Sequence, residues 1–138
     1  MPPWTCPDCG RSFGRTNQSH GCAPSSTVDD YFDGRPAVLR TAFNAIARHL
    51  ATLEGVKVDP VSACVMFKRS RTFAEVRAKR DCLVLSFILS RVLDDERITK
   101  TLQLSANRTV HSVDIKRAGD VDRTVRAWLT ESYAASPL

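Results

Sequence analysis

Apolar side chains recur at helical spacing in two stretches of the chain, on either side of a strand-rich centre. Between Pro36 and Gly55 the apolar face comprises Leu39, Phe43, Ile46, Ala47, Leu50 and Leu53. Between Asp120, the expected N-cap, and Ala135 it comprises Val121, Val125, Trp128 and Leu129. These two stripes predict the main helices of the domain, each with one face turned to a core.

The centre of the chain has the pattern of strands. Runs rich in apolar and β-branched residues cover 62–69, 72–78, 82–89, 100–105 and 108–116. The turns that join the first three runs are short and charged, so these neighbours are expected to pair antiparallel. The order α-β-β-β-β-α predicts an α+β fold, a two-layer domain in which two main helices pack on an antiparallel sheet of four to five strands.

The run 82–89 is apolar at almost every position, which is typical of a central strand covered at least partly on both faces. The run 108–116 instead alternates, and one of its faces carries Thr109, His111, Val113 and Ile115.

A different pattern occupies the first residues, where cysteine and histidine gather. The spacing Cys6-x2-Cys9-x10-His20-x-Cys22 offers three thiolates and one imidazole, the ligand types that Zn²⁺ binds in a tetrahedron. A C-x2-C pair places two sulfurs on one tight turn, and Gly21 permits the bend between the second pair. We expect a zinc knuckle with one structural Zn²⁺. Two alternatives remain, namely unrelated buried cysteines and a redox dithiol of Cys6 and Cys9.

Small and polar residues then separate the knuckle from the rest. Thr27 and Asp30 have the spacing of a capping box, which predicts a short helix over residues 28–33. We therefore divide the chain into a zinc knuckle at 1–25 and an α+β domain at 26–138. The knuckle is too short to hold the recognition helix of a classical DNA-reading finger.

Composition restricts the class of protein only broadly. Of the 138 residues, 43% are apolar and 25% are charged, a globular mixture with a formal net charge of +5. No apolar run approaches the ~20 residues that span a bilayer, so no membrane partner is expected. The start of the chain lacks a basic and then apolar signal segment, and cysteines that cluster as metal ligands suit a reducing compartment. We expect a cytoplasmic protein.

Basic residues concentrate in one hairpin, over residues 68–80. The candidate anion-binding residues there are Lys68, Arg69, Arg71, Arg77 and Arg80, with Phe73 available to stack on a base. Phe73 and Arg77 are expected on one face of the strand, and Arg108 and Lys116 extend the surface if their strand packs nearby. The alternative interpretation is an edge decorated with charge for solubility.

Few other residues offer chemistry. His111 is either a satisfied core histidine or a residue that contacts a ligand. Cys64 and Cys82 lie inside apolar strands, where a thiol is usually inert. The chain has neither a phosphate-binding loop of the Walker or G-x-G-x-x-G type nor a G-x-S-x-G elbow.

Four segments of the chain together resemble those of a known family. They are "WTCPDCGRSFGRTNQSHGC", "VDDYFDGRP", "RTVHSVDIK" and "DVDRTVRAWLTESYA". In this combination and order the chain resembles a family of uncharacterised bacterial domains that pair a Cys/His finger with a small α+β domain. The resemblance implies the fold and a zinc site at Cys6, Cys9, His20 and Cys22, places His111 and Trp128 in a strand-to-helix signature, and implies no reaction.

Three hypotheses about function follow. The first is a zinc-binding module for a nucleic acid, another phosphate-bearing partner or an acidic protein. The second is an enzyme or sensor that binds a small nucleotide-like ligand near His111. The third is a homodimer formed through an exposed sheet face. Binding of phosphate should weaken steeply with salt, whereas an apolar dimer interface should not.

Overall fold

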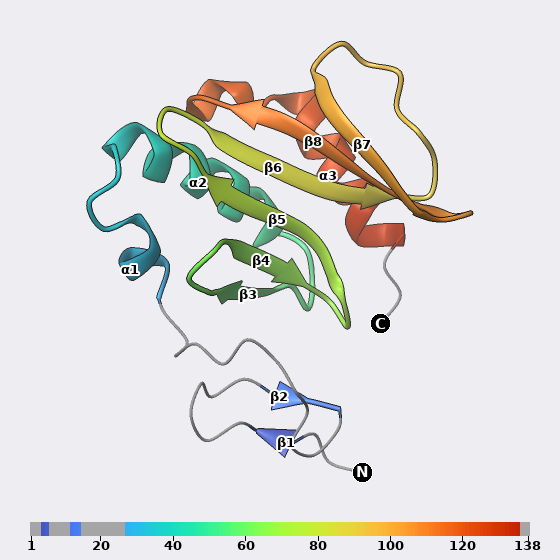
Figure 1. The fold of residues 1–138 in the computed structure, drawn as a ribbon, viewed down its shortest axis with the longest axis horizontal. Helices are drawn as coiled ribbons and strands as arrows, with labels where there is room; N and C mark the ends of the chain where they lie inside the picture. Colours follow the sequence, from blue (N-terminus) through green and yellow to red (C-terminus); the bar gives the residue numbers. More distant parts are fainter. Residues whose placement is uncertain (1–3, 6–11, 15–26, 136–138) are drawn as a thin grey trace.

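A computed structural model describes residues 4–5, 12–14 and 27–135 of the chain. Its body is a six-stranded antiparallel sheet with the strand order β3-β4-β5-β6-β8-β7, and the helices lie behind one face of that sheet (Figure 1). The other face carries no helix of the described residues. None of the described helices is long and apolar enough to cross a membrane.

The helices are α1 (Val28–Phe32), α2 (Ala37–Leu50) and α3 (Arg123–Ala135), with a 3₁₀ turn, η1 (Ala118–Asp120), before α3. The strands of the sheet are β3 (Lys57–Pro60), β4 (Val65–Lys68), β5 (Thr72–Ala78), β6 (Leu83–Leu89), β7 (Ile98–Ser105) and β8 (Arg108–Ile115). Two short strands near the start of the chain, β1 (Trp4–Thr5) and β2 (Ser12–Phe13), pair with each other.

The predicted α+β fold with an antiparallel sheet is confirmed, but the predicted number of strands is wrong. The sheet has six strands because β3 pairs with β4 along its outer edge. The segment that forms β3, "KVDP", alternates poorly and contains Pro60, and proline is tolerated in a sheet mainly at such an edge. A pattern of hydrophobic alternation therefore could not reveal it.

The helix starts follow local hydrogen bonds. The predicted capping box is present, since Thr27 Oγ1 accepts the N–H of Asp30 at 3.0 Å and Asp30 Oδ2 accepts the N–H of Thr27 at 3.2 Å. The prediction that Asp120 caps the last helix is wrong. Asp120 ends η1, and Asp122 caps α3 by accepting the N–H of Val125 at 2.9 Å.

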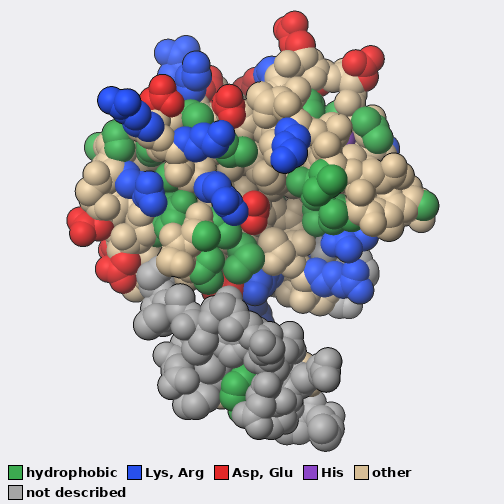
Figure 2. Space-filling view, viewed as in Figure 1, with side chains coloured by type: hydrophobic (Ala, Val, Ile, Leu, Met, Phe, Trp, Pro, Cys, Tyr) green, Lys and Arg blue, Asp and Glu red, His purple; other side chains and the backbone are tan. Residues whose placement is uncertain are grey.

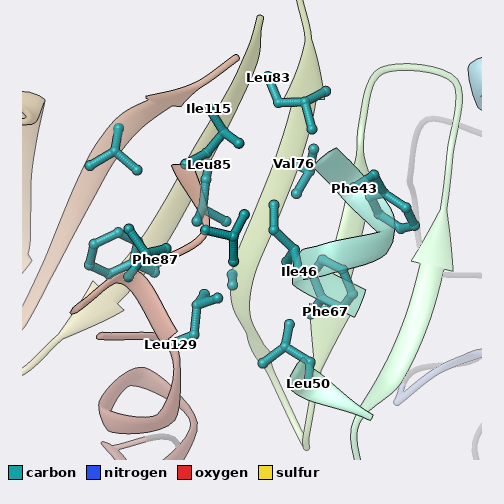
Figure 3. Packing of buried hydrophobic residues seen from close by; sticks show 14 of the residues in the cluster. Phe43, Ile46, Leu50, Phe67, Val76, Leu83, Leu85, Phe87, Ile115 and Leu129 are labelled. Atoms are coloured by element: carbon teal, nitrogen blue, oxygen red, sulfur yellow. The ribbon is translucent and has the colours of Figure 1, made fainter. Parts of the chain in front are cut away.

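The core lies between the sheet and the helices, with β6 at its centre. The four residues of β6 that face the helices are completely buried: Leu83, Leu85, Phe87 and Leu89. Against them pack Ile46 and Leu50 of α2 and Leu129 of α3 (Figure 3). The alternate residues of β6, on the open face, are half-buried. This central place for the run 82–89 agrees with its continuous apolar pattern.

Three residues of the loop between β6 and β7 fix it to the domain: Arg91, Leu93 and Arg97. His111 is completely buried with its ring stacked on Phe87, and its Nε2 accepts the N–H of Leu93 at 3.0 Å. Arg91 makes two hydrogen bonds of 2.9 Å to the Glu131 carboxylate. Arg97 lies over the Trp128 ring and pairs with Asp122. This loop must cross β8, because β7 is the outermost strand.

Two helix hydroxyls replace hydrogen bonds where neighbouring strands separate. The Tyr31 hydroxyl accepts the N–H of Ala78 at 2.8 Å and donates to the carbonyl of Ala63 at 3.3 Å, just beyond the last β4–β5 pair. Ser132 Oγ accepts the N–H of Ile88 at 3.2 Å, and its one proton is shared between the carbonyl oxygens of Ile88 at 2.6 Å and Phe73 at 2.9 Å, just beyond the last β5–β6 pair. Buried backbone groups are thereby satisfied without a ladder.

Replacing Ser132 with Ala is expected to lower the free energy of unfolding by about 1–3 kcal/mol, because it leaves buried backbone groups of β5 and β6 unpaired. Thermal and urea unfolding measure the change. Ser105→Ala is the matched control, since Ser105 is exposed in β7. Equal stability of the two variants would show that the hydroxyl bridge contributes nothing.

Acidification is expected to destabilise the domain through His111. Burial is the largest influence on the pKa of the His111 imidazole, and it lowers that pKa below its ordinary value. Because the folded pKa lies below the ordinary value near 6.5, the unfolded chain binds this proton more readily, and stability falls as the pH drops below about 6.5.

His111→Gln should remove part of that pH dependence when the free energy of unfolding is measured by urea titration between pH 7.5 and 5. His49→Gln serves as the comparison, since His49 is only partly buried and its pKa is also lowered by burial. An unchanged pH dependence in His111→Gln would refute this assignment.

Candidate functional site: a basic notch at one end of the sheet

Two basic residues of the hairpin, Lys68 and Arg69, already bind other groups of the protein. Lys68 Nζ lies 2.8 Å from Asp59 Oδ2, so its charge is paired with the neighbouring strand. The Arg69 guanidinium lies 4.1 Å from the centre of the Tyr133 ring, and its Nη1 donates to the Tyr133 carbonyl at 3.2 Å. Both residues therefore connect elements within the protein.

Arg71 instead meets Arg108 at a notch of about 340 Å³. The notch opens where β5 and β6 separate, beyond the pair Ala74–Phe87. It is lined by Arg71, Thr72, Phe73, Ile88, Leu89, Ser90, Asn107, Arg108, Ser132 and Ala135. No carboxylate belongs to this lining, and no described residue pairs with either guanidinium.

Local chain geometry produces this arrangement. The β4–β5 turn and the β7–β8 turn lie at the same end of the sheet as the last residue of β6, because Lys68 pairs with Thr72 and Leu89 with Thr109. Arg71 directly precedes β5 and Arg108 begins β8. The sequence predicted Arg71 as an anion-binding residue and Arg108 as a conditional extension, and in the structure both line the notch.

The expectation that Phe73 stacks on a partner is wrong. Phe73 is 1% exposed, and its ring packs edge-on against Tyr133 of α3 with the centroids 5.9 Å apart. A register shift in the β4–β5 pair, after Phe67, turns Phe73 toward the helices. Arg77 is exposed, so the two residues do not share a face as the plain alternation of a strand predicted.

Arg77 and Arg80 lie away from the notch. Arg77 borders a shallow hollow of about 370 Å³ on the open face of the sheet, together with Lys79, Lys100 and the carboxylates of Glu75 and Asp114. Arg80 is exposed in the β5–β6 turn, at the opposite end of the sheet from the notch. Figure 2 shows basic, acidic and apolar side chains interspersed over the open face, so its charge is mixed.

His111 lines neither the notch nor the hollow. Its ring is completely buried, its Nε2 is occupied by the Leu93 N–H, and Nδ1 has no hydrogen-bond partner among the described residues. Burial lowers the pKa of the imidazole, so the ring is neutral at pH 7. It acts here as a core side chain that holds a loop.

Cys64 and Cys82 lie directly before β4 and β6, not inside the strands as predicted, and both are protected thiols. Burial raises the pKa of Cys64 to about 11, with a further contribution from Glu75, whose Oε2 lies 3.7 Å from the sulfur. Burial also raises the pKa of Cys82, and Asp114 adds to that shift. Neither thiol is ionised appreciably at neutral pH, which makes both poor nucleophiles.

A second basic hollow was not anticipated from the sequence. Arg48 and His49 of α2 and Arg126 of α3 border a hollow of about 470 Å³ on the helical side. His49 Nε2 and Thr130 Oγ1 are 2.8 Å apart, and Arg126 donates to the Val121 carbonyl at 2.9 Å. His49 and Arg126 are thus engaged within the protein, whereas no described residue pairs with the exposed Arg48. Helical spacing placed His49 off the apolar stripe, but nothing local revealed that α3 lies beside it.

The proposed zinc ligands Cys6, Cys9, His20 and Cys22 lie outside the described residues. Within the described ones, no three His, Cys, Asp or Glu side chains gather as a metal site. At the notch two arginines without a described partner line one opening, and guanidinium groups of this kind recognise phosphate and carboxylate groups.

Comparisons with known proteins give a family but no activity. Neither the curated proteins nor the solved structures contain a match to this chain. A family model described as a domain of unknown function (DUF5655) matches residues 28–136. The match begins at the first residue of α1 and ends one residue beyond α3, so it covers the sheet, the helices and the notch. The chain therefore belongs to the DUF5655 family of domains of unknown function.

Proposed function

We propose that this chain is a small cytoplasmic zinc-binding protein that acts by binding a phosphate-bearing partner, with nucleic acid as the leading candidate. One observation carries the proposal: Arg71 and Arg108 come from separate turns to the same notch, without a carboxylate beside them.

Arg71 and Arg108 place two positive charges at the notch, and no carboxylate lines it. Two guanidinium groups at one notch repel each other, and a bound anion relieves that repulsion. Arginine offers several N–H donors in a planar fork that matches phosphate oxygens. Within the protein, Asp59 neutralises the charge of Lys68 and Asp122 neutralises that of Arg97. Arg71 and Arg108 have no such partner among the described residues, so an external anion suits them.

Binding rather than catalysis is favoured by the state of the potential catalytic groups. Cys64 and Cys82 are un-ionised thiols, and His111 is enclosed by the core. A general base or nucleophile has to reach its substrate, and none of these three groups borders the notch. The alternative of an enzyme or sensor with its ligand near His111 is correspondingly weaker.

Replacing Arg71 and Arg108 together with Gln is expected to weaken binding to short single- and double-stranded oligonucleotides. It should also flatten the salt dependence, because each lost phosphate contact lowers the slope of log affinity against log salt by roughly 0.7–0.9. Fluorescence anisotropy at several salt concentrations measures both effects.

Arg80→Gln is the matched control, since Arg80 is an exposed arginine like Arg71 but lies at the other end of the sheet. It should retain most of the affinity. Absence of binding at low salt, or equal losses in both variants, would leave the hairpin as a charged edge that serves solubility.

Two exposed leucines favour a second candidate function, association of two copies of the chain. Leu102 and Leu104 of β7 are 54% and 49% exposed. An apolar contact between copies would persist as salt is raised, whereas phosphate binding would not. The same salt series, followed by sedimentation of the protein alone, therefore distinguishes the two functions.

The zinc knuckle remains part of the proposal on the strength of its ligand spacing. Protein purified without chelator is expected to hold about one zinc per chain, because three thiolates and one imidazole fill a tetrahedral site. Elemental analysis measures the content. Cys9→Ser should lose the metal, whereas Cys82→Ser should keep it, since Cys82 is a buried residue of the sheet domain. Metal-free wild-type protein would end the knuckle interpretation.

A further inference from the structure

We infer that the notch recognises the terminal phosphate monoester of a nucleotide, as a free mononucleotide or at the 5′ end of a strand, and not the diester backbone. This inference rests on the proposed function and specifies the chemical group that the site takes. The observations behind it are the number of cations at the notch, the positions of the other cations and the nature of the walls.

The charge at the notch matches a monoester better than a diester. A phosphate monoester carries about −1.5 to −2 at pH 7, whereas each backbone diester carries one negative charge. Two arginines and no carboxylate line the notch, so a dianion neutralises the pair. Asn107 and Ser90 supply further polar groups at the same opening. A single diester would leave one guanidinium without a partner.

The remaining cations do not continue the notch into a track. A groove that follows a nucleic-acid backbone needs successive positive charges along its length. Here Lys68 and Arg69 are engaged by Asp59 and Tyr133. Arg77 shares its hollow with Lys79, Lys100 and two carboxylates, and Arg80 lies at the far end of the sheet. None of these cations lines the notch, so its two arginines form a separate positive site, as recognition of one phosphate group requires.

The walls of the notch suit a compact, partly apolar body attached to that phosphate. Of its apolar lining residues, Ile88 is half-buried and Ala135 is exposed, while Phe73 and Leu89 are almost completely buried. Its volume of about 340 Å³ falls within the ~300–1,000 Å³ typical of small-ligand sites. A phosphopeptide fits less well. Ser132 already occupies the Ile88 N–H and lies against the carbonyl oxygens of Phe73 and Ile88, the backbone groups that an added peptide strand would use.

The test compares two otherwise identical single strands of twelve nucleotides, labelled at the 3′ end, with either a phosphate or a hydroxyl at the 5′ end. Fluorescence anisotropy should give about tenfold tighter binding of the phosphorylated strand, the effect of one or more charge-assisted hydrogen bonds. Arg71→Gln with Arg108→Gln should abolish the difference, and Arg80→Gln should keep it. A thermal transition confirms that each variant is folded.

Competition identifies the source of the phosphate. Adenosine monophosphate should displace the phosphorylated strand at lower concentration than inorganic phosphate or adenosine does. Equal affinity for the two strands would overturn this inference and leave the proposed function standing, whereas no binding of either strand at low salt would overturn both. Stronger displacement by a phosphotyrosine peptide than by the mononucleotide would also overturn it.

Discussion

The domain depends on one constraint: two helices, α2 and α3, together bury the central strand β6. β6 lies inside the sheet, and all four of its helix-facing residues are completely buried. α2 and α3 come from opposite ends of the α+β domain, and both contribute to the core that covers this strand. Burial of this apolar surface is the dominant favourable contribution to folding, so each helix requires the sheet in order to cover its own apolar face.

The notch lies where two strands of this sheet separate. β6 stays paired with β8 over its whole length, whereas β5, which has a register shift against β4, leaves β6 beyond Ala74. An opening of this kind normally exposes unpaired backbone groups, which is costly in a buried place. Ser132 of α3 removes that cost by bonding to both strands, as Tyr31 of α1 does where β4 and β5 separate. The opening is therefore stable before any ligand arrives. Its two arginines have fixed places beside it, since Arg71 directly precedes β5 and Arg108 begins β8.

Local patterns in the sequence predicted much of the fold. Helical stripes, the capping box at Thr27 and the alternation of 108–116 depend on neighbours in the chain, and the structure agrees with all three. What the sequence could not reveal depends on pairing between distant residues. β3 exists because β4 offers it an edge, and Phe73 turns inward because of a register shift. Arg69 is engaged because α3 ends beside it, and only the folded chain distinguishes it from Arg71.

The two register shifts in β7, beside Thr99 and Leu104, have a consequence for how the protein behaves at high concentration. An outer strand with a long regular backbone is a template for another chain, and such growth leads to aggregation. Between its two irregular points β7 keeps a regular run of only four residues, 100–103, and at the opposite edge β3 ends at a proline. Neither border can readily accept a strand from a neighbouring molecule. The domain can thus leave leucines at its surface without the sheet propagating from one copy to the next.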